Sequence, residues 1–308
     1  MPELDFSQLS GVGAPQDRKN MGSVASIRQG GADDMGADTS FTLGFAGRQI
    51  SISATVRDVS SDLIVFMHGF GCAKECFAGA FQESSLREYS LCTFDFPGHG
   101  TSAALPSGES SLESYADITC SLIAALAPEH VFIVCHSMGG AVGVLAAQSL
   151  PNLAFLVNVE GNLIGRDCGL VSRRTADASP EEFVAHEFPS FAAELLGSSR
   201  PDLHAWGQWY ARCEPRAMHA LSRSLVEWSD SDKLLDAFLD IRHRAYVYGE
   251  RSELDYLFPR LGSTTLRTVQ RSGHFPMLDN RTDFYATVAN EIVKEHKGHS
   301  RQLATPRL

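Results

Sequence analysis

Residues 131–140 constrain the fold of this chain more than any other stretch. They begin with the apolar, β-branched run Val-Phe-Ile-Val, which is typical of a buried strand, and lead directly into good helix formers after Gly140. Ser137 lies at the corner between the two. A serine at such a corner sits in a tight turn, with its hydroxyl above the sheet edge and the helix N-terminus beneath it. The stretch therefore predicts a buried strand, a helix and a candidate nucleophile between them.

The same alternation of strand and helix continues on both sides of this corner. Apolar runs that are typical of buried strands alternate with segments of helical periodicity, which indicates βαβ units and an α/β fold with a mostly parallel sheet covered on both faces. An opening β-hairpin is expected at residues 41–45 and 49–56. The further expected strands are residues 62–68, 90–95, 131–136, 154–159, 244–248 and 265–269, with helices at 76–86, 112–126, 141–148 and 282–294.

The alternation of expected strands and helices is interrupted once, and this interruption indicates how the chain is divided into a core and an insertion. Residues 163–240 contain three tryptophans and several helix-like stretches, and they predict a helical cap inserted over the carboxyl edge of the sheet. The core is then made of residues 41–162 and 241–296. Residues 1–40 are rich in small and polar side chains and predict a flexible arm, and residues 297–308 predict a disordered tail.

Composition and short motifs exclude several classes of function. The chain has 308 residues and a net charge of −11, which argues against a nucleic-acid partner. Its seven cysteines are irregularly spaced and Cys72-x-x-x-Cys76 has no second pair, so we expect no zinc site and reduced thiols in a cytoplasmic protein. Neither a signal peptide nor a stretch long enough to cross a bilayer is evident, so no membrane insertion is expected. A P-loop lysine and a dinucleotide-binding pattern are also missing, so no cofactor is expected.

Four segments give the chain a family resemblance. They are His68-Gly-Phe-Gly71, Asp95-Phe-Pro-Gly-His-Gly100, Cys135-His-Ser-Met-Gly-Gly140 and Ser272-Gly-His-Phe275, and they follow expected strands in this order. With these segments the chain resembles the α/β-hydrolase superfamily over residues 41–296. The resemblance implies a mostly parallel central sheet with helices on both faces, a helical cap and a serine esterase-like activity. The chain departs from the family pattern at Cys135, where the family usually has glycine.

Ser137 and His274 form the first part of a candidate catalytic site. A serine hydroxyl is a poor nucleophile and needs an adjacent base, and an imidazole changes protonation near neutral pH. His274 lies in a Ser-Gly-His-Phe-Pro loop between the last expected strand and the last helix. The resemblance implies an oxyanion hole formed by the backbone N–H groups of Phe70 and Met138.

The acid that would orient His274 is open to two interpretations. The family most often carries it as Gly-x-x-Asp after the strand at residues 244–248, but this chain has Ser252 at that position. Glu253 or Glu250 could reach in from the same loop. Alternatively, Glu160 follows the preceding buried strand, where a carboxylate needs a partner to persist. We favour Glu160, with Glu253 and Glu250 as alternatives.

Together these features predict a serine hydrolase that cleaves a small, fairly apolar carboxylic ester or lactone through an acyl-enzyme. Hydrolysis of a C–C bond in a β-diketone-type substrate would use the same groups. A slow or non-catalytic small-molecule receptor on the same fold is the alternative from another functional class. A small molecule is the only expected partner, and the sequence does not indicate the oligomeric state.

Overall fold

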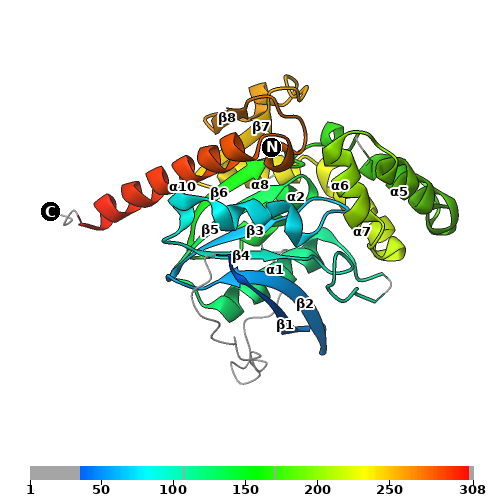
Figure 1. Ribbon diagram of the computed structural model, residues 1–308, viewed down its shortest axis with the longest axis horizontal. Coiled ribbons are helices and arrows are strands. Elements are labelled where there is room, and N and C mark those ends of the chain that lie inside the picture. Colours follow the sequence, from blue (N-terminus) through cyan, green and yellow to red (C-terminus); the bar gives the residue numbers. More distant parts are fainter. Residues whose placement is uncertain (1–34, 107, 170, 305–308) are drawn as a thin grey trace, which may run out of the picture.

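A computed structural model describes residues 35–106, 108–169 and 171–304. These residues form one eight-stranded sheet in the order β1-β2-β4-β3-β5-β6-β7-β8 (Figure 1). The strands β1 and β2 are antiparallel to each other, β2 is antiparallel to β4, and all other neighbours are parallel. The mostly parallel α/β sheet is thus confirmed. The strands are β1 Ala37–Phe45, β2 Arg48–Arg57, β3 Asp62–Met67, β4 Ser90–Phe94, β5 His130–His136, β6 Leu153–Val159, β7 Arg244–Gly249 and β8 Thr265–Val269.

The central strands owe their position to continuous apolar sequence. Every residue of β4 is buried, and so is every residue of β3, β5 and β6 after the first. A strand that is apolar on both faces must be covered on both faces, which is the usual condition of a parallel sheet. The edge strand β1 instead alternates buried and exposed residues around Phe41 and Leu43, and its outer face stays polar.

Helices cover the two faces of this sheet. The helix α10 packs against β6, β8 and the 3₁₀ segments η2 and η3, and it crosses in front of the sheet in Figure 1. The helix α2 packs against β5 and β6 and contacts both α1 and α8. The elements are η2 Lys74–Gln82, η3 Ser84–Leu86, α1 Leu112–Leu126, α2 Met138–Ala147, α8 Lys233–Asp240, η6 Phe258–Arg260, α9 Pro276–Asp279 and α10 Arg281–Ala304.

Between β6 and β7 the described residues contain helices and loops but no strand. Figure 1 shows α5, α6 and α7 of this insertion grouped beside the sheet. Whether the insertion behaves as a separate cap domain stays a prediction. Its elements before α8 are η4 Gly165–Gly169, α3 Ser172–Asp177, α4 Pro180–Glu182, the π-helical η5 Phe183–Glu187, α5 Phe188–Leu196, α6 Pro201–Tyr210 and α7 Pro215–Asp230.

Three element boundaries differ from those expected. The strand β1 begins at Ala37, inside the expected arm, because the hairpin pairs as far as Ala37 with Val56. The expected helix at 76–86 is two 3₁₀ segments. The helix α10 continues to Ala304, so the tail expected to be disordered from residue 297 is helical to that point. Its sequence there is rich in helix formers and has no proline before residue 306. The rest of the expected arm and tail, residues 1–34 and 305–308, lies outside the described residues.

No helix among the described residues combines the length and the apolar character needed to cross a membrane.

Candidate active site

Four loops that meet at one edge of the sheet carry the candidate site. The strands β3, β5, β6, β7 and β8 are parallel, so their carboxyl ends lie at the same edge. Phe70 follows β3, Ser137 follows β5, Glu160 follows β6 and His274 follows β8. Residues more than one hundred positions apart in sequence therefore come into contact there.

Ser137 occupies a strained turn between β5 and α2. Its φ is 53° and its ψ is −123°, a conformation that residues other than glycine rarely adopt. Hydrogen bonds hold the turn: the N–H of Ser137 donates to the carbonyl of Val159 at 3.0 Å, and its own carbonyl accepts from Gly140 at 2.7 Å. A Cβ at Gly139 would come within 2.4 Å of the His68 carbonyl oxygen. The turn is therefore tight enough to require glycine at that position.

Cys135 replaces the small residue that the family resemblance leads one to expect before this corner. It is buried, and its Sγ lies 3.5 Å from the carbonyl of Val157. A Cβ at Gly143 of α2 would lie 2.8 Å from that Sγ. The missing side chain at Gly143 thus provides the space that the thiol of Cys135 occupies between strand and helix.

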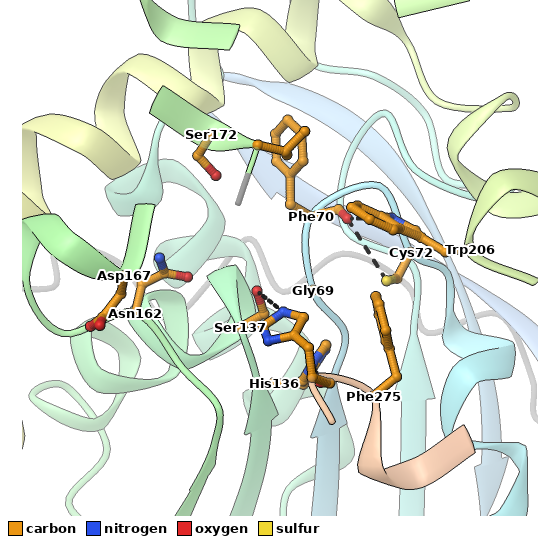
Figure 2. Close-up of a pocket in the computed structure, with 12 residues that line it drawn as sticks. Gly69, Phe70, Cys72, His136, Ser137, Asn162, Asp167, Ser172, Trp206 and Phe275 are labelled. Atoms are coloured by element: carbon orange, nitrogen blue, oxygen red, sulfur yellow. Dashed lines mark hydrogen bonds between the residues drawn. The ribbon is translucent and has the colours of Figure 1, made fainter. Parts of the chain in front are cut away.

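The structure brings Ser137, His274 and Glu160 into one line of contacts. The hydroxyl of Ser137 lies 3.2 Å from Nε2 of His274, and Nδ1 of His274 lies 3.4 Å from Oε2 of Glu160. The Ser137–His274 contact is dashed in Figure 2. The Glu160 side chain is 3% exposed, and its Oε1 accepts a hydrogen bond of 2.7 Å from the N–H of Gly249. The carboxylate is therefore buried with both oxygens in contact with a donor.

The two alternative carboxylates do not contact His274. Glu250 and Glu253 are both exposed. Oε2 of Glu250 accepts a hydrogen bond of 2.7 Å from the N–H of Arg271, so it braces the turn after β8. Within the described part of the chain, no hydrogen bond or ion pair joins either carboxylate to His274.

Two buried histidines hold the loops of the site. Nε2 of His136 donates to the carbonyl of His274 at 2.8 Å, and burial holds the pKa of His136 well below 6.5, so it is neutral. Nδ1 of His68 donates to the carbonyl of Gly69, and its Nε2 accepts from the N–H of Phe96 at 3.0 Å. Burial lowers the pKa of His68 to about 4, so it can keep that acceptor role at neutral pH.

The expected oxyanion donors are Phe70, in the loop after β3, and Met138, the first residue of α2. Their backbone N–H groups have no hydrogen-bond partner within the described part of the chain. Trp206 of α6 donates a hydrogen bond of 2.9 Å from Nε1 to the carbonyl of Phe70. The next residue, Gly71, has a φ of 68°, and a Cβ there would lie 2.3 Å from the ring of Tyr210. The inserted helix thus fixes the loop that carries Phe70, a contact that no sequence motif indicated.

A pocket of about 350 Å³, including its open mouth, lies over Ser137 (Figure 2). Its apolar lining residues are Phe70, Cys72, Val171, Trp206 and Phe275. Its polar lining, apart from Ser137 and the two histidines, consists of Asn162, Asp167 and Ser172, none of which the sequence analysis had selected.

A metal site is not evident in the part of the chain that the structure describes, because no group of three His, Cys, Asp or Glu side chains there could hold an ion.

Residues 64–288 match the sequence profile of the Alpha/beta hydrolase family. The chain belongs to this family. The resemblance inferred from the four motifs is therefore confirmed, together with the α/β-hydrolase fold.

The alpha/beta hydrolase family contains many activities, and the curated relatives match only part of this chain. A Mycoplasma genitalium protein named as an esterase/lipase is 32% identical over 90 residues, which are 29% of this chain and 34% of that protein. A 2-succinyl-6-hydroxy-2,4-cyclohexadiene-1-carboxylate synthase of Salmonella typhimurium is 33% identical over 130 residues, 40% of this chain and 48% of the relative. The chain thus spans a third to a half of the length of these relatives.

Solved structures share the fold at low identity. An esterase of Thermogutta terrifontis superposes with a TM-score of 0.66 at 17% identity, over 84% of this chain and 99% of that one. The N-acyl homoserine lactonase AidH superposes with a TM-score of 0.65 at 18% identity, over 84% and 97%. These neighbours share the fold of this chain, and the family match supports a hydrolase in the broad sense.

Proposed function

We propose that this alpha/beta hydrolase cleaves a small, fairly apolar carboxylic ester or lactone through a serine acyl-enzyme. The observation that carries the proposal is the line of contacts from Ser137 through His274 to Glu160, at 3.2 and 3.4 Å, beneath an open pocket. The named activities of the esterase and lactonase neighbours agree with this substrate class.

In the first half of the reaction, Ser137 Oγ attacks the ester carbonyl as His274 Nε2 takes its proton. The carbonyl oxygen becomes an oxyanion, which the N–H groups of Phe70 and Met138 stabilise. Glu160 holds the tautomer of His274 that has its proton on Nδ1, and it stabilises the imidazolium that forms. His274 then gives the proton to the departing alkoxide, and the alcohol leaves.

In the second half, a water molecule replaces the alcohol. His274 accepts a proton from this water as its oxygen attacks the acyl carbon, and a second oxyanion forms in the same position. When this intermediate collapses, the proton returns to Ser137 Oγ and the carboxylic acid is released. In a lactone the alcohol and acid are parts of one molecule, so the product is a single hydroxy acid.

A fluorophosphonate probe and two chromogenic esters, p-nitrophenyl acetate and butyrate, test this proposal. We expect covalent labelling at Ser137, identified by mass spectrometry, and many turnovers per molecule. Ser137→Ala should lose the labelling and lower kcat by about 10⁶-fold, as for the nucleophile of a serine protease. A wild-type protein that is not labelled would contradict the proposal.

The same experiment separates the alternatives. A single turnover followed by a stall would favour a slow small-molecule receptor, because acylation would then proceed without release. Labelling together with cleavage of a β-diketone, and no cleavage of either ester, would favour the C–C bond hydrolase.

A further inference from the structure

The pocket over Ser137 has two chemically different walls. Figure 2 shows Phe70, Trp206 and Phe275 on one side of Ser137, and Asn162, Asp167 and Ser172 on the other. The first wall is aromatic and can only offer apolar contact, apart from the Trp206 N–H that is already bonded to Phe70. The second wall consists of residues from the loop after β6, from η4 and from α3. A substrate that lies across Ser137 therefore meets different chemistry at its two ends.

Asn162 supplies an unsatisfied acceptor to the second wall. The residue is 4% exposed, and its backbone N–H donates to the carbonyl of Ser137 at 3.2 Å, which ties it to the nucleophile corner. Its Nδ2 lies 3.8 Å from Sγ of Cys168, whereas its Oδ1 has no partner among the described residues. Figure 2 shows the amide oxygen directed into the pocket, on the side of Ser137. This oxygen therefore faces the pocket with no protein donor, and it can accept a hydrogen bond from a donor on a bound molecule.

Ser172 and Asp167 extend the acceptor character of this wall. Ser172 is 7% exposed, and its hydroxyl has no hydrogen-bond partner in the described part of the chain. Asp167 is held in place by three donors: the Tyr256 hydroxyl at 2.6 Å and two backbone N–H groups at 2.8 and 2.9 Å. Among the described residues, no lysine or arginine lines the pocket. A carboxylate on the substrate would face the half-buried carboxyl group of Asp167 here and no compensating cation.

We propose that Asn162 and Ser172 form a polar subsite for a neutral hydrogen-bond donor on the substrate, a hydroxyl or an amide N–H close to the scissile carbonyl. The remaining hydrocarbon lies against Phe70, Trp206 and Phe275. The inference rests on the proposed function, since the subsite acts on the ester held at Ser137. It predicts a preference for neutral hydroxylated or amidated esters and lactones, and discrimination against anionic ones.

Two sets of esters test the subsite, with release of acid followed by titration. The acyl set is methyl butyrate, methyl 3-hydroxybutyrate and monomethyl succinate, which differ in having no substituent, a hydroxyl and a carboxylate. The alcohol set is propyl butyrate and 2-hydroxyethyl butyrate. In at least one set we expect kcat/KM to favour the hydroxylated ester by about tenfold, the value of one hydrogen bond, and monomethyl succinate to be the poorest substrate.

Substitutions assign that preference to the two side chains. Asn162→Leu should reduce the preference for the hydroxylated ester to below about threefold, and Ser172→Ala should reduce it in part, because each removes one acceptor. Ser121→Ala is a matched control, since Ser121 lies on α1 outside the pocket lining and its hydroxyl bonds only to the carbonyl of Asp117 within α1. It should leave the preference unchanged. Fluorophosphonate labelling of each variant checks that the nucleophile is intact.

Three results would overturn the subsite: no preference for the hydroxylated ester in either set, a preference for monomethyl succinate, or a preference that survives both substitutions. If the wild-type protein is labelled, these results refute the subsite and leave the serine hydrolase standing. Absence of both labelling and turnover in the wild type refutes the proposed function, and the subsite with it.

Discussion

The ends of strands β6 and β7 lie next to each other at the same edge of the sheet, and each is followed by a glutamate. After β6, Glu160 has a φ of 50° and a buried side chain that contacts His274. After β7, Glu250 is exposed and bonds to the backbone of Arg271. Two similar sequence positions thus have different surroundings, and only one carboxylate is directed at the histidine.

The two strand ends nevertheless act on the same histidine. Gly249, the last residue of β7, donates its N–H to Glu160 at 2.7 Å. A Cβ on Gly249 would lie 2.4 Å from the carbonyl of Gly273, so this glycine also packs directly under the loop that carries His274. One strand end supplies the carboxylate, and its neighbour supplies a backbone donor and a close contact. Substitutions at the two ends can separate these contributions.

The largest effect should come from Glu160→Gln, which keeps the shape of the side chain and removes its charge. An amide can hold the wrong tautomer of His274 and cannot stabilise its imidazolium. We expect kcat to fall by about 10³–10⁴-fold with the fold intact, by analogy with the same change in a serine protease. Steady-state ester hydrolysis and circular dichroism would measure the two properties.

Glu253→Gln is the matched control for this change, because it makes the same substitution on an exposed side chain. If Glu160→Gln lowers kcat by less than about tenfold and Glu253→Gln lowers it by more, the acid belongs to the loop after β7. A decrease of more than about tenfold for Glu253→Gln would exceed what an exposed charge contributes.

The contact between Ser137 and His274 could be anticipated from sequence because it follows from regular structure. Ser137 comes directly after β5 and His274 lies in the loop after β8, and parallel strands bring their carboxyl ends together. The acid is a harder case. Its position depends on the positive φ of Glu160 and on a backbone donor from Gly249, and neither feature can be recognised in residue spacing. Sequence reasoning could therefore place the carboxylate on one of two strands but could not decide between them from geometry.

The pocket walls could not be predicted in the same way. The loop after β6 and the inserted helices carry Asn162, Ser172 and Trp206. In these segments neither a motif nor an alternation of strands and helices indicates where a side chain points. Trp206 reaches Phe70 only because α6 packs against the loop after β3. Such contacts depend on how helices far apart in sequence pack, which helical periodicity does not report.

Transfer of the acid from the end of β6 to the loop after β7 tests directly whether the two strand ends differ in their access to His274. In the double variant Glu160→Gln with Ser252→Asp, the new carboxylate occupies the position that the family most often uses. We expect partial recovery over Glu160→Gln alone, with kcat still about 10²-fold below wild type, since a misplaced catalytic group costs about that much. Recovery to wild-type kcat would show that the two strand ends are interchangeable. The single variant Ser252→Asp serves as the control for any effect of the added charge.

Gly249→Ala should have an intermediate effect. Its Cβ would lie 2.4 Å from the Gly273 carbonyl and 2.6 Å from that of Ser272, so the His274 loop must shift. We expect a loss of about 1–3 kcal/mol in the free energy of unfolding from overpacking. A displaced histidine should also lower kcat by about 10–100-fold. Chemical denaturation and ester hydrolysis would measure both. Gly44→Ala in β1, whose Cβ would meet no atom within 4 Å and whose φ is not positive, is a control for loss of a glycine.

The smallest effect should come from Glu250→Gln at the β7 end. This side chain is exposed, and the amide oxygen of glutamine can still accept the hydrogen bond from Arg271. We expect kcat to change by less than about threefold and the free energy of unfolding by less than about 1 kcal/mol, as for other exposed charges. A kcat more than tenfold below wild type would mean that the Glu250 charge reaches His274 through the turn that it braces. The division of roles between the two strand ends would then be wrong, because both carboxylates would act on the histidine.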